Sequence, residues 1–347
     1  MDKTPLVYSR RFASLDYGPG HPFRGSRFTG FMELARETGF LDEVGVFEPD
    51  VATPEHLLLA HDPKYLEKVE EFAREGKRLS PDTPLEPGMP LATRRIVGGA
   101  LMTGQLAIEH GLCLGFGGLH HAARNRGGGF CAYNDVAVLI NWLKKQGYKR
   151  ILNLDTDAHN GDGTMDIFFS DPRVLYISTH QDPSTLYPGR GFVKDIGYDD
   201  GAGFTVNLPL PMGAALKDYE MCFEEIIFPL VEQFKPDVVI RNGGSDPAFW
   251  DDLTYLGLDI DGLKYLGEQT RSLSVERDVP LADLTLSGYG GYIPEGWIAI
   301  WAGVLGLDDF KLPSAPVEEM GWRNEVEPGT ARMISELKKE LADYWNL

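Results

Sequence analysis

Cysteine is scarce in this chain. Its 347 residues include only Cys113, Cys131 and Cys222, and no two of them lie close together in the sequence. The chain therefore has neither a disulfide framework nor a Cys-x-x-Cys zinc site. We expect all three cysteines to be small buried residues.

A long hydrophobic run is also missing. No segment approaches the ~20 consecutive apolar residues that a membrane-spanning helix needs, and residues 1–11 lack the apolar core of a signal peptide. We therefore expect a cytoplasmic protein that does not bind membranes.

Positive charge is in deficit. The chain has 33 Lys and Arg residues against 52 Asp and Glu residues, which gives a formal net charge of −19. This balance argues against binding nucleic acid through a basic surface. It is compatible with a cationic substrate or partner, although many proteins are acidic for solubility alone.

Short apolar segments alternate with amphipathic segments along the chain. We expect strands at residues 151–154, 173–178, 237–240 and 281–286, and helices at 54–76, 92–110, 136–146, 215–234, 260–276, 295–305 and 329–345. The proline-rich stretch 80–90 is expected to be a loop. Strands that alternate with helices predict an α/β fold, with one open, doubly wound, mostly parallel sheet and helices on both faces. No linker or repeat divides the chain, so we expect residues 1–347 to form a single domain.

Residues 151–163 contain the most informative motif. An apolar run that predicts a buried strand leads into Asp155, Asp157 and His159. A strand directs alternate side chains to one face, so these three groups point the same way if the chain stays extended. Grouped ligands of this kind cost stability unless they bind something, most simply a divalent cation.

A further ligand follows the strand at 237–240. Loops at the carboxyl ends of parallel strands form the ligand sites of such sheets, and Asp246 lies in one of them. Asp, His and Asp with an open position is the composition of a catalytic metal centre. Taken alone, Asp246 is equally well explained as the cap of a helix or turn.

Two glycine-rich loops add chemistry to this set. His120 and His121 are adjacent, and they can form an acid–base pair if carboxylates such as Asp155 and Asp162 hold their tautomers. The glycines around them do not fit G-x-G-x-x-G, which disfavours a dinucleotide site. Tyr292, after the glycines near 288–291, can donate its hydroxyl to a developing oxyanion. Each feature alone is weak evidence.

Together the motifs resemble the histone deacetylase superfamily, which includes acetoin-utilisation proteins and acetylpolyamine amidohydrolases. The matching segments are residues 82–89, 117–121, 129–135, 155–163, 244–246 and 290–292, in the order of that family. The resemblance implies a catalytic zinc, or iron, bound by Asp157, His159 and Asp246. It also implies that His120 pairs with Asp155, that His121 pairs with Asp162, and that Tyr292 polarises the substrate carbonyl.

The resemblance assigns further residues around this centre. Gly129, Phe130, Tyr187 and Leu253 would line a tunnel for the acyl-lysine side chain, Asp82 would bind substrate backbone at the rim, and Arg27 would line an acetate channel. Structural potassium would be held at two sites, one formed by Asp155, Asp157, His159, Ser178 and Thr179, and the other by Phe168, Asp171 and Val174.

Three departures from the family pattern leave the substrate preference, and the tuning of the site by residues around the ligands, open, but not the chemistry. Asn160 stands where a second histidine is usual, Arg241-Asn242-Gly243 is an unusual approach to the third metal ligand, and Ala132 replaces a bulkier residue. No proposed ligand or catalytic group is lost.

We therefore expect a metal-dependent deacetylase that hydrolyses the amide of N-acetyl-lysine in a protein or peptide and releases acetate and a free amine. An acetylpolyamine amidohydrolase or another acyl-lysine deacylase is the main alternative, with a small acetylated amine as substrate. Acetylpolyamine amidohydrolases typically carry a long insertion before the His-His motif that narrows the entrance to the site. The segment between Asp82 and His120 is short here, which favours an open entrance and a protein substrate. An arginase-like binuclear site is disfavoured, because Ala248 lies where a second metal needs a carboxylate. A non-catalytic binding protein would be expected to have lost part of the site.

Overall fold

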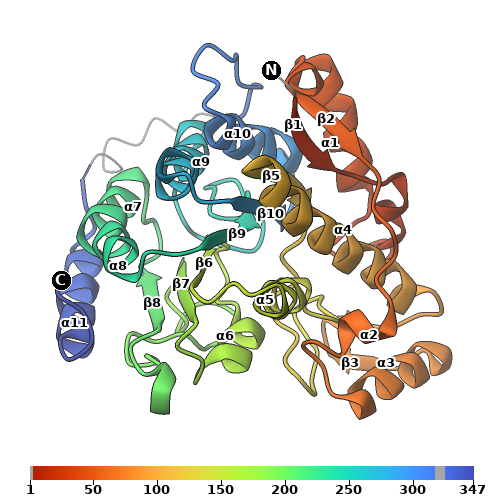
Figure 1. The fold of residues 1–347 in the computed structure, drawn as a ribbon. Helices are drawn as coiled ribbons and strands as arrows, with labels where there is room; N and C mark the ends of the chain where they lie inside the picture. Colours follow the sequence, from red (N-terminus) through yellow and green to blue (C-terminus); the bar gives the residue numbers. More distant parts are fainter. Residues whose placement is uncertain (1–2, 317–324) are drawn as a thin grey trace.

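One sheet of eight strands organises the molecule (Figure 1). The structure is a computed structural model, and it describes residues 3–316 and 325–347. The strand order is β2-β1-β5-β10-β9-β6-β7-β8, and every pairing in this sheet is parallel. The strands are β1 Thr4–Val7, β2 Val44–Phe47, β5 Leu112–Phe116, β6 Ile151–Asp155, β7 Val174–Gln181, β8 Thr205–Leu210, β9 Val238–Gly244 and β10 Leu281–Ser287. The predicted α/β class with a mostly parallel sheet is confirmed.

The central strands are buried along their whole length. Every residue of β5, β6, β7, β9 and β10 is buried, as expected for parallel strands that are covered on both faces. The four strands predicted from apolar runs are confirmed as β6, β7, β9 and β10. The sequence patterns did not identify β1, β2, β5 and β8.

Helices cover both faces of the sheet. In Figure 1, α4 (Met89–His110), α5 (Asp135–Lys145) and α6 (Asp162–Phe168) lie on one side. The helices α7 (Leu216–Cys222), α8 (Phe228–Phe234), α9 (Ile260–Leu273) and α10 (Ile293–Leu305) lie on the other, where α1 (Ser26–Glu37) packs against α10. The terminal helix α11 (Pro328–Leu341) packs beside the edge strand β8.

The helix predicted at 54–76 is wrong as a continuous element. It is two helices, α2 (Pro54–Leu57) and α3 (Pro63–Glu75). Pro63 disfavours helical backbone at the residue before it, and Asp62 is extended, with ψ of 144°. Thr53 caps α2, and Gly76 ends α3 in a left-handed conformation.

The expected loop at 80–90 is also only partly correct. A short hairpin, β3 (Arg78–Ser80) and β4 (Thr83–Pro84), occupies its first half, and α4 begins at Met89. The segment 215–234 is helical as predicted, with a π-helical turn at Phe223–Ile227 between α7 and α8. The predicted helix at 260–276 ends earlier, and a 3₁₀ turn at Val275–Arg277 follows it.

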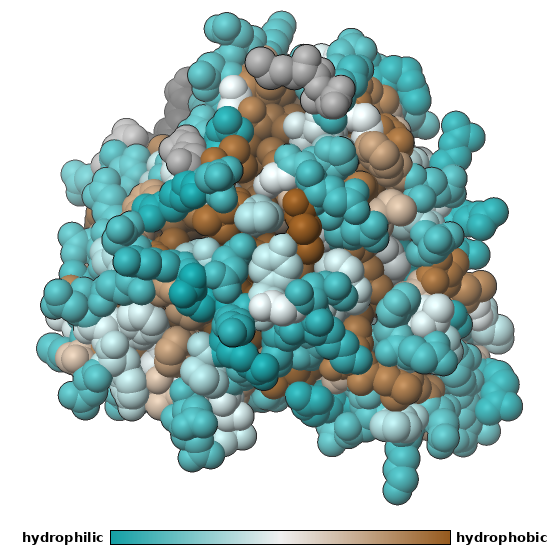
Figure 2. Space-filling model, in the orientation of Figure 1, coloured by the Kyte–Doolittle hydropathy of each residue, from teal (hydrophilic) through white to brown (hydrophobic). Residues whose placement is uncertain are grey.

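The surface in Figure 2 is mostly hydrophilic, with hydrophobic groups in patches between polar side chains. The three cysteines are buried, as expected. Within the described residues, every helix is too short or too polar to cross a membrane.

The sheet order brings the motif-bearing loops together. The strands β5, β10, β9, β6 and β7 are neighbours, so their carboxyl ends lie along one edge of the sheet. Ligand sites of open parallel sheets form at this edge. The loops that follow these five strands contain most of the residues singled out by the sequence.

Candidate active site

Asp157, His159 and Asp246 converge at the carboxyl ends of two paired strands. The first two follow β6 and the third follows β9, and the strands pair in register at Asp155 and Asn242. One ligand atom from each residue lies within 4.8 Å of the others. His159 Nδ1 lies 3.0 Å from Asp157 Oδ1 and 3.1 Å from Asp246 Oδ2. The structure thus groups the three predicted metal ligands.

The donor set fits a divalent cation. Two carboxylates, 4% and 0% exposed, face one imidazole nitrogen that carries at most a single proton. Burial and the charge of Asp157 raise the pKa of Asp246 well above its usual range. Burial lowers the pKa of His159, but its bonds to both carboxylates outweigh this and raise that pKa to about 10. Nitrogen and oxygen donors of this kind are ligands that zinc accepts.

Neighbouring groups hold these ligands in place. Ser287 Oγ donates a 2.6 Å hydrogen bond to Asp246 Oδ1, and the backbone N–H of Ala158 donates to Asp246 Oδ2 at 3.2 Å. The backbone N–H of His159 donates to Asp157 Oδ1 at 2.8 Å. Hydrogen bonds of this kind orient metal ligands. No sequence pattern indicates this role for Ser287.

The two adjacent histidines each pair with the carboxylate expected for them. His120 Nδ1 lies 2.8 Å from Asp155 Oδ2, and His121 Nδ1 lies 2.9 Å from Asp162 Oδ1. Their Nε2 atoms are 3.2 Å apart. Asp155 therefore turns toward His120, the partner that the resemblance implies for it, and does not point the same way as Asp157 and His159. Backbone leaves the extended conformation after Asp155, where β6 ends.

Burial and charge separate the two imidazoles electrostatically. Burial lowers the pKa of His120, but Asp155 and Asp157 outweigh it and raise that pKa to about 9. The pKa of His121 is lowered by burial and by the positive charge of His120. Two titratable groups with opposite shifts can divide acid and base roles between them.

The loop that contains these histidines is held by buried side chains that the sequence patterns did not reveal. Asn134 Nδ2 donates to the carbonyl oxygens of His120 at 3.2 Å and Ala122 at 2.9 Å. His61 Nδ1 donates to the carbonyl of Ala123 at 2.9 Å, and its Nε2 accepts from the backbone N–H of Asn134. The loop is therefore fixed from within the core.

A cavity of about 210 Å³ opens onto the metal ligand His159 and onto His121. Its lining residues are Asp82, His121, Gly129, Phe130, His159, Leu186, Tyr187, Leu253 and Tyr289. The five residues predicted to bind substrate are all among them. Leu186 and Tyr187 belong to the loop of residues 182–195 that follows β7, which we call the tunnel-wall loop. A second, smaller cavity shares His121, Gly129, Phe130 and Tyr289 with the 210 Å³ cavity, and its lining includes His120, Asp157 and Ser287.

Glycine is required at position 129. Its φ is +56°, and a Cβ atom would lie 2.4 Å from Cδ2 of His121. Phe130 also has a positive φ, 66°, and its backbone is held by hydrogen bonds to Thr83 Oγ1 at 2.9 Å and from Tyr17 Oη at 2.6 Å. Strained backbone of this kind clusters at functional sites.

Tyr292 does not lie in the cavity, so the structure does not place it where its predicted role requires. It is 44% exposed, begins α10 as its N-cap, and its ring contacts Trp250. Tyr289 lines the cavity instead. It is 7% exposed, and its ring centroid lies 6.1 Å from that of His159. Tyr289 follows β10 directly, whereas Tyr292 in the Gly-Gly-Tyr motif starts the next helix.

Arg27 lies on the far side of Tyr289. It is buried, its Nη1 donates to the carbonyl of Leu286 at 3.0 Å, and its guanidinium lies 5.4 Å from the centre of the Tyr289 ring. Its role in an acetate channel stays a prediction.

The residues predicted to bind potassium form two groups. Asp155 pairs with Ser178 across β6 and β7, next to Thr179 and to the loop of Asp157 and His159. Phe168, Asp171 and Val174 lie in one tight turn, linked by backbone hydrogen bonds of 2.9 and 3.1 Å. Potassium binding stays a prediction at both places.

Two of the departures from the family pattern have polar partners of their own. Asn160 Nδ2 donates to Asn207 Oδ1 at 2.9 Å. Arg241 is fully buried, where its Nη1 lies 3.2 Å from Asp283 Oδ1 and its Nε donates to Thr156 Oγ1 at 3.0 Å. Arg241 thus links β9 to β10 through the ion pair, and to the residue that follows β6 through Thr156.

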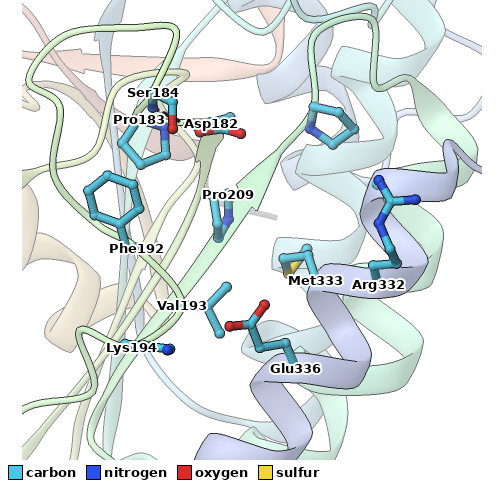
Figure 3. Close-up of a pocket in the computed structure, with 12 residues that line it drawn as sticks. Asp182, Pro183, Ser184, Phe192, Val193, Lys194, Pro209, Arg332, Met333 and Glu336 are labelled. Atoms are coloured by element: carbon cyan, nitrogen blue, oxygen red, sulfur yellow. Dashed lines mark hydrogen bonds between the residues drawn. The ribbon is translucent and has the colours of Figure 1, made fainter.

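A larger cavity lies elsewhere. It has a volume of about 500 Å³ and lies between the tunnel-wall loop, the end of β8 and α11. In Figure 3, Phe192 and Lys194 face Met333 and Glu336 across it. The lining of this 500 Å³ cavity includes none of the metal ligands and neither His120 nor His121. The cavity of about 210 Å³ is therefore the candidate active site.

The chain is similar to several known proteins. Residues 21–307 match the histone deacetylase domain family. A protein described as "Probable deacetylase" from Archaeoglobus fulgidus is 33% identical over 99% of this chain and 98% of its own length. The acetoin utilization protein AcuC of Staphylococcus aureus (strain MRSA252) is 32% identical over 99% of this chain and 96% of its own.

A more distant AcuC and a solved structure extend the comparison. AcuC of Bacillus subtilis is 30% identical over 89% of this chain and 84% of its own length. The crystal structure of the HDA15 HD domain superposes with a TM-score of 0.86 over 99% of this chain and 96% of that chain. At 22% sequence identity, this last likeness concerns the fold alone.

Proposed function

Because the chain belongs to the histone deacetylase family, a family of hydrolytic deacetylases, we propose that it is a metal-dependent enzyme that hydrolyses the amide of N-acetyl-lysine in proteins or peptides. The observation that carries this proposal is the convergence of His121, His159 and Tyr289 on one cavity. A proton acceptor, a metal ligand and a hydroxyl donor thus surround the same small space.

The metal would be held by Asp157, His159 and Asp246, with zinc the best match to the donor set and iron an alternative. Bound there, it would polarise the amide carbonyl and lower the pKa of a neighbouring water toward ~7.

His121 is our assignment for the general base. Its imidazole lines the cavity, and because Nδ1 donates to Asp162, Nε2 is left as the proton acceptor. His120 lies deeper, at 2% exposure against 7% for His121, and holds its proton beside Asp155. The 3.2 Å separation of the two Nε2 atoms lets a proton taken from water be shared and then donated to the leaving amine.

Tyr289 is our assignment for the group that stabilises the oxyanion. Burial raises the pKa of its phenol well above 10, with the nearby Asp157 adding to the effect. The hydroxyl therefore stays protonated and can donate a hydrogen bond to the oxygen on which charge develops.

The shape of the cavity supports a long, thin acyl-amine side chain as substrate. The aromatic rings of Phe130 and Tyr187 line it, and Asp82 lies at its wall, where it accepts the backbone N–H of Gly129 at 3.2 Å. An aliphatic chain between aromatic walls, with a polar backbone outside, matches an acyl-lysine. The net charge of −19 favours a second candidate, a cationic acetylated polyamine.

A substrate panel tests the proposal. Purified protein should be assayed for acetate or acid release from an acetyl-lysine peptide, peptides with longer acyl-lysines, and acetylated polyamines. We expect the highest kcat/KM for the acetyl-lysine peptide, and no release by His121→Ala. A higher kcat/KM for the polyamines would favour the second candidate, and release from none of these substrates would contradict both.

A further inference from the structure

A series of ion pairs connects the tunnel-wall loop to the acid–base pair. Arg190, on this loop, holds Asp166 through both terminal nitrogens, each at 2.8 Å from a carboxylate oxygen. Arg126 Nη2 lies 2.7 Å from Asp166 Oδ2 and 2.8 Å from Asp162 Oδ2. One guanidinium nitrogen thus joins a surface carboxylate to the carboxylate that holds His121.

Asp162 is bound on both oxygens. Oδ1 accepts from His121 Nδ1 at 2.9 Å, and Oδ2 accepts from Arg126 at 2.8 Å. Its side chain is 9% exposed, whereas that of Arg126 is 41% exposed. Charge-assisted hydrogen bonds from opposite sides fix the orientation of a carboxylate, and hence the orientation of the imidazole that it holds.

The tunnel-wall loop also touches His121 directly. The ring of Tyr187 meets the imidazole edge to face, with centroids 5.0 Å apart and planes at 76°. The loop is therefore connected to the same histidine in two ways. Tyr187 contacts the imidazole ring directly, and the ion pairs connect Arg190 indirectly to the Nδ1 side.

We propose that Arg126 is a positioning residue for the acid–base pair, and that Arg190, through Asp166, fixes the tunnel-wall loop to the same ion pairs. This inference rests on the proposed function, because it takes His121 to be the base. Without Arg126, Asp162 has one free oxygen and can rotate, so His121 is aligned for only part of the time. The effect falls on the chemical step. Loss of Arg190 instead loosens the wall that binds the substrate side chain.

The test compares Arg126→Gln and Arg126→Lys with Arg124→Gln, an exposed arginine of the same loop that lies outside these ion pairs. Arg126→Gln should lower kcat about fivefold on the acetyl-lysine peptide and change KM less than about twofold. Arg126→Lys should recover part of this loss, because an ammonium restores the charge but not the planar fork. Arg190→Gln should raise KM roughly threefold with a smaller change in kcat. Thermal unfolding of each variant accompanies the kinetics.

The possible results are distinguishable. If the wild-type protein hydrolyses the peptide and Arg126→Gln matches Arg124→Gln, the positioning role is wrong and the proposed function stands. The positioning role is also wrong if Arg126→Gln lowers kcat, raises KM and lowers the unfolding temperature together. If the wild-type protein does not hydrolyse the peptide, the proposed function fails and the role of Arg126 fails with it.

Discussion

Two single substitutions, Tyr289→Phe and Tyr292→Phe, test which tyrosine of the glycine-rich turn acts in catalysis. The structure favours Tyr289, whereas the sequence motif favours Tyr292. Tyr289→Phe removes a single hydroxyl from the cavity wall, and Tyr292→Phe removes the same group from a side chain that is 44% exposed and packs on Trp250. The pair is matched in chemistry and in sequence neighbourhood, and only position differs.

The expected magnitudes differ widely. Loss of one oxyanion donor in a buried site lowers kcat by roughly 10²–10³, and Tyr289, at 7% exposure beside His159, meets that description. An exposed hydroxyl outside the cavity should change kcat by less than about twofold. KM should change little in either variant, because the hydrogen bond forms to charge that develops in the transition state.

Steady-state hydrolysis of an acetyl-lysine peptide, with both variants at equal metal content, measures these effects. A large loss of kcat in Tyr292→Phe with normal activity in Tyr289→Phe would refute the assignment. Such a result would mean that the turn at 288–291 rearranges when substrate binds.

Two further predictions concern the support of the site and of the fold. The Asp251 carboxylate accepts hydrogen bonds from the backbone N–H groups of Leu253 and Tyr289 at 2.8 and 2.7 Å. Because Asp251→Asn disturbs these bonds, we expect it to lose roughly 1–3 kcal/mol of stability and to lower kcat several-fold. An effect no larger than that of the neighbouring Asp252→Asn, in thermal unfolding and kinetics, would contradict this prediction. The second prediction concerns the pH dependence of stability. Burial raises the pKa of Asp171, but hydrogen bonds from Arg173 and Lys144 outweigh burial and hold the pKa of this carboxyl well below its usual value. Asp171 therefore contributes stability above the unfolded-state pKa of ~3.9, and this contribution is lost as the pH falls through the lower folded-state value. Asp171→Asn should therefore cost about 1 kcal/mol at pH 7, allowing for solvent screening, and progressively less in denaturant titrations at lower pH, whereas a difference that grows toward acid would show the sign to be wrong.

Residues close together in the sequence were the ones that sequence patterns placed correctly. Asp157 and His159 are two positions apart at the end of an apolar run, and His120 and His121 are adjacent, so local geometry alone groups each pair. The third ligand, Asp246, was found because parallel strands end at a common edge of the sheet.

Residues whose roles depend on turns or on distant contacts were missed or misplaced. Tyr289 and Tyr292 share one glycine-rich turn, and only the backbone decides that the second begins α10 with φ of 59°. Asp166 and Arg190 approach Arg126 from a helix and a loop far away in the sequence, and no pattern in the chain signals this contact. The break between α2 and α3 can be predicted from the sequence, because Pro63 lies inside the segment predicted as one helix.

The proposed function rests on the claim that one metal ion, held by Asp157, His159 and Asp246, is required for amide hydrolysis. Its most direct test is a titration of metal-free protein with Zn²⁺, following acetate release from an acetyl-lysine peptide and bound metal on the same samples, with Asp246→Ala in parallel. We predict that activity is absent without metal, rises to a plateau at about one equivalent, and is not restored in Asp246→Ala. Full activity in the metal-free protein, or undiminished activity in Asp246→Ala, would contradict the claim.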